Sequence, residues 1–316
     1  MLTVSSGDIV TIDTISHEGI LPDQGRDPVS FFAEHGVPAD SVLRDAIELA
    51  GSAVAHDPGR DGPHVVTGPI FVKNAQPGDA VSIEVLELLV RAPYGIVSNR
   101  HGRGTLAGEF PETDEVSGQR PFLVSRFATL HGNDAVVWGP GGGLALPQRR
   151  FLGLMAVAPE GGAAHSGPPG RHGGNLDVRL LGVGSRLHLP VQVPGALVQV
   201  GDPHFAQGDG EVALTALEGP LRAVVRIELH KGGAPALPVG ETDDAWVILG
   251  LHQDLDEAVR IAVRAGVAHI CTLTGLDRAT VYAWMSAAAD IAVSQVVDGV
   301  KGVHVVVPKR WLDVLA

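Results

Sequence analysis

The sequence predicts a mainly β chain with an α+β C-terminal part, and two observations carry this expectation. Short apolar runs interrupted by Pro-Gly pairs dominate the first two thirds, which is the pattern of a β-sandwich or barrel. Helical periodicity becomes prominent only in the last third. We therefore expect a β-rich domain over residues 1–219 that carries most of the site, followed by an α+β domain over residues 220–316.

The β-rich part contains two well-marked pairs of strands. Within residues 68–88, Pro77-Gly78 suits the central positions of a type II turn, and apolar and polar residues alternate after it as in a half-buried strand. Residues 187–200 repeat this form, with apolar runs on both sides of Pro194-Gly195. We expect a strand, a turn and a strand in the first case and an apolar hairpin in the second.

The C-terminal third contains two predicted helices and two predicted strands. Asp254 can cap a helix with Glu257 three residues later, and small and apolar residues then share one face up to Gly266. A second helix is expected to start at residues 274–277 and to run through Ala288. The apolar runs at residues 291–297 and 303–307 indicate strands.

Bulk properties exclude several classes of partner. The 316 residues carry a formal net charge of −13 with no segregated basic patch, which opposes binding to nucleic acid. No apolar run approaches the ~20 residues that span a bilayer, and residues 1–8 lack the basic and apolar segments of a secretion signal. We expect no membrane interaction and a cytoplasmic location.

Residues 170–211 bring together most of the side chains that can bind a metal or transfer a proton. In an extended chain, residues i and i+2 project from the same face. Three such pairs occur here: Asn175 with Asp177, Asp202 with His204, and Asp209 with Glu211. Pairs of this kind let the ends of strands build a site.

These residue types suit hydrolysis of an amide, which needs an electrophile to polarise the carbonyl group and an activated water. We expect a divalent metal ion held by Asp177, Asp202 and His204, with Asp13 and His17 joining from the N-terminal strand. Nitrogen and oxygen ligands are compatible with zinc, which we expect, and also with manganese.

Candidate catalytic residues lie beside these ligands, and a structural alternative stands next to them. Glu211 is the candidate general base, Asn175 is expected to orient the substrate, and Asp209 joins them as a third candidate. The alternative is a structural role for Asp202 and Asp209, which belong to Gly-Asp and Asp-Gly pairs. Such pairs commonly mark turns, in which the carboxylate bonds its own backbone. Cys271, the single cysteine, lies in an apolar run and is expected to be an inert, buried thiol that forms no intrachain disulfide.

Several motifs resemble the acetamidase/formamidase family in sequence, order and spacing. The specific ones are Gly-Gly-Asn-Leu-Asp at residues 173–177 and Gln-Gly-Asp-Gly-Glu at residues 207–211. Residues 67–79 and 299–309 extend the likeness over most of the chain. The resemblance implies a β-sandwich or jelly-roll body, hydrolysis of short amides to a carboxylate and ammonia, metal binding and a homo-oligomer, dimer or higher. It places the site at Asn175, Asp177, His204 and Glu211.

Two other functions remain open at this stage. The same scaffold suits a hydrolase for a lactam or a larger amide, which differs only in the shape of the pocket. It also suits a non-catalytic protein that binds a metal or a small ligand, because a fold does not determine a function. A small amide substrate is nevertheless the partner that the motifs favour.

Overall fold

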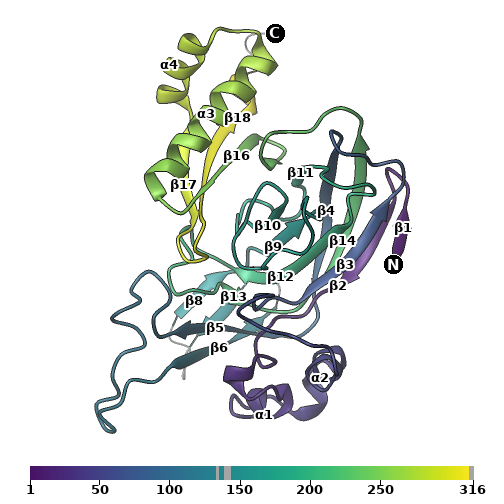
Figure 1. Cartoon of the computed structure of the whole chain (residues 1–316). Coiled ribbons are helices and arrows are strands. Elements are labelled where there is room, and N and C mark those ends of the chain that lie inside the picture. The colour runs from purple at the N-terminus through teal and green to yellow at the C-terminus, as the bar shows by residue number, and fades with distance from the viewer. Residues whose placement is uncertain (133–134, 139–143, 313–316) are drawn as a thin grey trace.

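The computed structural model describes residues 1–132, 135–138 and 144–312, and these residues form two large β-sheets with helices at opposite ends of the molecule (Figure 1). The expected mainly β chain with C-terminal helices is therefore confirmed.

The first sheet has ten strands and holds most of the site. Its strands follow the order β1 (Leu2–Val4), β3 (Val66–Val72), β12 (Val198–Ala206), β13 (Leu217–Glu218), β5 (Tyr94–Arg100), β6 (Leu123–His131), β7 (Ala135–Trp138) and β8 (Leu144–Pro147). Two further strands lie off this path: β9 (Phe151–Ala156) pairs with β12, and β10 (Gly173–Asn175) pairs with β9.

The second sheet has eight strands. Its strands follow the order β17 (Asp290–Gln295), β18 (Lys301–Pro308), β16 (Ala245–His252), β15 (Val239–Glu241), β11 (Arg186–Pro190), β4 (Ala80–Val90), β14 (Leu221–His230) and β2 (Ile9–Asp13). Strands from both sides of residue 220 thus join one sheet, and a domain boundary near that residue stays a prediction.

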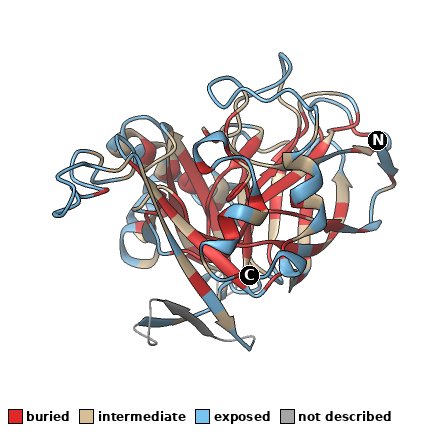
Figure 2. Ribbon diagram, turned by 90° about the horizontal axis from the view of Figure 1, so that it is seen from below, coloured by how far each residue is buried: buried red, intermediate tan, exposed pale blue. Residues whose placement is uncertain are grey.

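The main core lies between the two sheets. Fully buried residues of both sheets pack together in it, including Val72 and Val198 of the first sheet and Ile83 and Ile227 of the second. Figure 2 shows the buried residues concentrated along the strands, with exposed residues on the loops and helices. A central core of this kind supports the site, because tightly packed strands hold their side chains in fixed positions.

The helices lie at the two ends of the molecule. The N-terminal group follows the order η1 (Pro22–Gln24), α1 (Pro28–Ala33), η2 (Ala39–Ser41) and α2 (Arg44–Ala50) along the chain. The C-terminal group consists of α3 (Leu255–Thr274) and α4 (Arg278–Ala288), with η3 (Lys309–Trp311) after the last two strands. The predicted cap at Asp254 is confirmed, since its side chain accepts from the Glu257 amide. The second helix begins within the expected residues 274–277, where Asp277 caps α4.

The first of these C-terminal helices is longer than the sequence predicts. It continues past Gly266 to Thr274, so the expected end at Gly266 is wrong. A side chain at Gly266 would meet Met285 Cε of α4 at 2.7 Å, so this glycine makes room for the neighbouring helix rather than ending its own. No single helix in the described part of the chain has both the length and the apolar content to cross a membrane; α3 and α4 meet that test only as a pair bent by 112°.

Residues 187–200 do not form the expected hairpin. The two strands do form, but β11 belongs to the second sheet and β12 to the first. The chain crosses from one sheet to the other through Gly195, Ala196 and Leu197, which all have a left-handed backbone, with φ of 81°, 56° and 56°. Both strands are largely buried, so their apolar pattern could not indicate which neighbour each would pair with.

Candidate metal centre

The floor of the site is built where β12 and β10 flank β9. Gly201 of β12 pairs with Leu154 and Pro203 with Leu152, which places Asp202 opposite Gly153. A Cβ atom at Gly153 would lie 2.4 Å from Asp202 Oδ2 and 2.5 Å from Asp177 Oδ1. Only glycine therefore allows the two carboxylates to approach one another over this strand.

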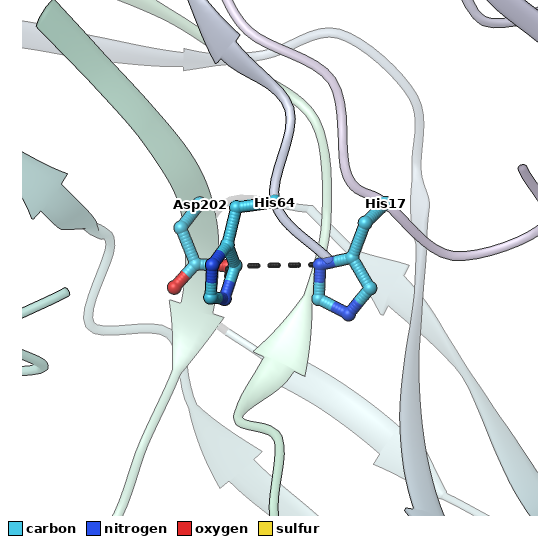
Figure 3. Close-up of side chains that lie close together, drawn as sticks. All are labelled: His17, His64 and Asp202. Atoms are coloured by element: carbon cyan, nitrogen blue, oxygen red, sulfur yellow. Dashed lines mark ion pairs between the residues drawn. The ribbon is translucent and has the colours of Figure 1, made fainter. Parts of the chain in front are cut away.

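Two histidines from the N-terminal part of the chain face Asp202 (Figure 3). His17 Nδ1 lies 3.8 Å from Asp202 Oδ1, and His64 Nε2 lies 3.7 Å from the same oxygen. The ligand atoms of these three residues all lie within 4.8 Å of one another. His17 follows β2 and His64 precedes β3, so two loops deliver the histidines to a strand of the main sheet.

A second hydrogen bond orients each of these rings. His64 Nδ1 lies 2.9 Å from Ser166 Oγ, which leaves Nε2 facing Asp202. His17 Nε2 lies 3.3 Å from Glu18 Oε1, which leaves Nδ1 facing Asp202. A partner on the far nitrogen sets the tautomer and the direction of a ligating histidine.

Glu18 is itself held by several donors. Its Oε2 accepts from Gln24 Nε2 and from Ser98 Oγ, and Arg100 lies 3.8 Å from Oε1. Burial raises the pKa of the Glu18 carboxyl, but His17, Arg100 and Ser98 outweigh burial and hold the pKa below its usual value. Glu18 is therefore a charged partner for His17.

His204 lies behind Asp202 in a second, fully enclosed contact. His204 Nε2 lies 3.0 Å from Asp202 Oδ2 and 3.1 Å from Glu218 Oε1 of β13. Burial lowers the pKa of His204, but Glu218 and Asp202 outweigh it and raise the pKa. The predicted pairing of Asp202 with His204 is present, and Glu218 completes it.

Three further acids crowd the same place. Asp177 and Glu211 are buried, and Asp298 interacts with both. Burial, together with repulsion from neighbouring carboxylates, raises the pKa of Asp177 and of Glu211. Three acidic residues of the site also have a left-handed backbone: Asp177, Asp202 and Glu211, with φ of 50°, 53° and 46°. Backbone of this kind costs free energy and is concentrated at functional sites.

These residues fit a divalent cation. Among the described side chains, His17 Nδ1, Asp202 Oδ1 and both Asp177 oxygens are buried without a hydrogen-bond partner. Buried polar atoms are normally paired, so these atoms need a partner of another kind. Burial lowers the pKa of His64 to about 4, so this ring is neutral and has a free lone pair at neutral pH. Two imidazole nitrogens and a carboxylate would form a donor set of the kind found at catalytic zinc sites.

The structure brings together six of the eight predicted site residues and separates two. The six are Asn175, Asp177, Asp202, His204, Glu211 and His17. Asp13 instead forms two hydrogen bonds with Arg222 on the neighbouring strand, at 2.6 and 2.8 Å. Asp209 bonds Arg179 at 2.6 Å and is partly exposed, while Glu211 is buried, so the expected same-face pair of Asp209 and Glu211 does not form.

Four residues of the site were not predicted. They are His64, Glu18, Glu218 and Asp298. His64 and Glu18 lie in loops without periodicity, and Glu218 lies in a strand of two residues, so no local pattern marked them. The density of histidines among acids in residues 17–64 was the one signal that could have directed attention to His64.

A cavity of about 460 Å³ opens onto this centre. Asp202, His17 and His64 lie at its polar side together with Asn175, Glu211, Glu218 and Asp298. A small molecule entering the cavity would therefore meet the two histidines, the acids and the amide of Asn175.

The fold and the site define a β-rich protein with a buried histidine and carboxylate centre suited to a metal ion. The sequence model described as the Acetamidase/Formamidase family matches residues 149–313, and the chain belongs to that family. The resemblance found in the motifs is thereby confirmed.

Relatives and solved structures agree with this assignment. Over 54% of its own length, this chain is 27% identical to a formamidase of Methylophilus methylotrophus. It is 29% identical to an acetamidase of Mycolicibacterium smegmatis, again over 54% of this chain. The matches span about half the length of these curated relatives, 52% and 54%.

The solved structures cover the whole fold. An acetamidase from Bacillus halodurans matches with a TM-score of 0.78 and 25% identity over 100% of this chain and 94% of that one. An acetamidase from Yersinia enterocolitica matches with a TM-score of 0.78 and 26% identity over 98% and 86%. A gamma lactamase from Delftia acidovorans, at 20% identity and a TM-score of 0.58, shares the fold alone.

Proposed function

We propose that this protein hydrolyses the carbon–nitrogen bond of a short-chain linear amide, of the formamide or acetamide type, to a carboxylate and ammonia. The observation that carries the proposal is the meeting of His17, His64 and Asp202, with unpaired donor atoms, at the wall of a cavity. The relatives named formamidase and acetamidase support the reaction type.

In this proposal His17, His64 and Asp202 hold a divalent metal ion, with zinc as the expected metal. When bound, such an ion supplies a Lewis acid for the amide oxygen and lowers the pKa of a coordinated water. Ser166 and Glu18 keep the two imidazole rings in the ligating orientation.

The chain's own residues then handle the substrate and the proton. Glu211 lines the cavity, and a carboxylate with a raised pKa is a stronger base than an ordinary one. We propose that a Glu211 carboxylate oxygen takes a proton from the attacking water and returns it to the leaving nitrogen. Asn175 also lines the cavity and has an unpaired Oδ1, which is suited to accept from the amide N–H of the substrate.

Ammonia release tests this function directly. The purified protein is assayed with formamide and acetamide as isolated, after chelation and after zinc is restored. We expect activity to vanish with chelation and to return with zinc, and His64→Ala to lower kcat/KM at least a hundredfold. His131→Ala changes an exposed histidine of β6 and serves as the matched control.

The other outcomes identify the alternatives. Activity that survives complete removal of metal would exclude the metal-assisted reaction. Zinc bound at one equivalent without ammonia from any amide or lactam would favour a non-catalytic metal-binding protein. The proposal also includes a homo-oligomer, on the basis of the motif resemblance, and sedimentation measures that property independently of the assay.

A further inference from the structure

The cavity at the metal centre is larger than formamide or acetamide requires. Its volume of about 460 Å³ lies in the range of roughly 300–1,000 Å³ that is typical of pockets for drug-sized ligands. Formamide and acetamide carry no acyl group larger than a methyl. Either substrate would leave most of this space filled by water.

The cavity is lined by apolar residues as well as by the polar groups of the centre. Six of its apolar lining residues, called the apolar wall below, are Leu21, Pro22, Pro58, Phe122, Pro168 and Leu214. All of these except Leu21 remain partly or fully exposed, and Phe122 has 60% of its surface exposed. A bound apolar group would remove this surface from water, which is favourable by about 25 cal/mol for each Å².

The backbone of the apolar wall is also conformationally restricted. Three of its residues are prolines, whose φ is restricted by the ring. A wall of this kind loses little conformational freedom when a ligand binds, so more of the free energy of burial appears as affinity.

Charge argues against an anionic substrate. Five carboxylate residues line the cavity against two arginines: Asp23, Asp202, Glu211, Glu218 and Asp298, with Arg100 and Arg103. Arg100 is already paired with Asp23 at 2.6 Å. A carboxylate on the acyl group would therefore find few free positive side chains among the residues that line the cavity.

We infer that the preferred substrate is a neutral primary amide with an extended apolar acyl group, which lies against Phe122 and the prolines while its amide reaches Asn175. This inference rests on the proposed function and names the substrate class of the same site. Water adds to the amide carbon, the carbon–nitrogen bond breaks, and the products are an apolar carboxylic acid and ammonia.

The test is a comparison of kcat/KM for acetamide, butyramide, phenylacetamide and succinamate with the metal-loaded protein. We expect kcat/KM to rise about fourfold for each methylene added between acetamide and butyramide, the equivalent of about 0.8 kcal/mol per buried methylene. Phenylacetamide should exceed acetamide at least tenfold. Succinamate has the chain length of butyramide but carries a carboxylate, and it should fall below butyramide.

Two variants locate the effect. Phe122→Ala should lower the ratio of kcat/KM for phenylacetamide to that for acetamide at least threefold. Phe110→Ala changes an exposed phenylalanine of the same connection between β5 and β6 that does not line this cavity, and it should leave the ratio unchanged. An unchanged ratio in a folded Phe122→Ala protein would overturn the inference.

The two proposals fail in different ways. A fall in kcat/KM with increasing acyl size, or a preference for succinamate, would overturn the inference and leave the proposed function standing. Absence of ammonia from formamide and from all four of these amides would overturn the proposed function and, with it, the inferred substrate class.

Discussion

Asp202 lies in the middle of the candidate site, between three histidines. One of its oxygens faces His17 and His64, and the other contacts His204. Burial raises the pKa of Asp202, but His204, His64 and His17 outweigh burial and hold it below its usual value. The side chain therefore stays charged inside the protein, where a charge without partners would be costly.

Glu18 gives the first prediction at this scale. Glu18→Gln removes the charge that faces His17 Nε2, so the ring loses the partner that directs Nδ1 toward Asp202. We expect zinc to bind ~10–100-fold more weakly, as for other partners of ligating histidines. Zinc affinity is measured by competition with a chelator. Glu34→Gln, at an exposed position, is the control, and a folded Glu18→Gln protein with unchanged affinity would contradict the assigned role.

His304 gives a prediction on stability and pH. It is buried, it contacts Ser294 Oγ at 2.8 Å, and burial lowers its pKa to about 4. Between that pKa and the ordinary value of 6.5, the unfolded chain binds a proton that the folded chain does not. The free energy of unfolding should therefore fall as pH decreases through this window, by at most about 1.4 kcal/mol per pH unit from this residue.

Urea unfolding of His304→Asn measures that contribution. The amide of asparagine can still bond Ser294, but it does not titrate. We expect the variant to show a shallower loss of stability between pH 6.5 and pH 4 than the wild-type protein. Equal slopes in the two proteins would show that His304 titrates in the folded state as it does in the unfolded chain.

At the scale of the elements, β9 is the support of the site. It lies between β10 and β12, and Gly153 at its centre leaves the space in which Asp177 and Asp202 approach. The Gly153 carbonyl also accepts the amides of Leu176 and Asp177, which holds the segment after β10 in place. One short strand thus fixes two of the acids.

Gly153→Ala tests this support. The added methyl would lie 2.4 Å from Asp202 Oδ2, so the carboxylates must move apart. We expect loss of zinc binding and of at least 99% of amide hydrolysis, together with a destabilisation of about 1–3 kcal/mol. Gly108→Ala, where a Cβ meets nothing within 4 Å, is the control. Wild-type zinc content in Gly153→Ala would show that the two carboxylates need not approach.

For the whole molecule, the site joins distant parts of the chain. His17 and His64 come from the N-terminal loops, Asp202 and His204 from β12, Glu218 from β13, and Asp298 from the loop between β17 and β18. Several of these carboxylates repel one another when buried. A bound cation would relieve this repulsion and link the segments that carry the ligands.

Metal removal should therefore lower the stability of the whole protein. A ligand at a hundred times its Kd stabilises the folded state by about 2.7 kcal/mol. We expect the Tm of the metal-free protein to rise by several degrees when zinc is added, and to rise much less in Asp202→Asn. Calorimetry measures both, and a Tm unaffected by zinc in the wild-type protein would argue against a metal at this centre.

Several features follow from short segments whose interactions are local. Asp254 and Asp277 cap helices because their side chains reach amides two or three residues away. The pairing of Asp202 with His204 follows from the two-residue repeat of a strand. The family motifs at residues 173–177 and 207–211 likewise predicted, from local sequence, Asn175, Asp177 and Glu211, which lie together in the structure.

The remaining features depend on contacts between segments that are far apart along the chain. The strands on either side of Pro194-Gly195 joined different sheets, because largely buried strands do not encode their neighbours. His64, Glu18 and Glu218 reached the centre on loops and on a strand of two residues, which have no periodicity. Asp13 accepts a hydrogen bond from Arg222 of β14 and does not lie at the centre. Packing of the two sheets determines which of these residues meet, and no pattern within a few residues encodes that packing.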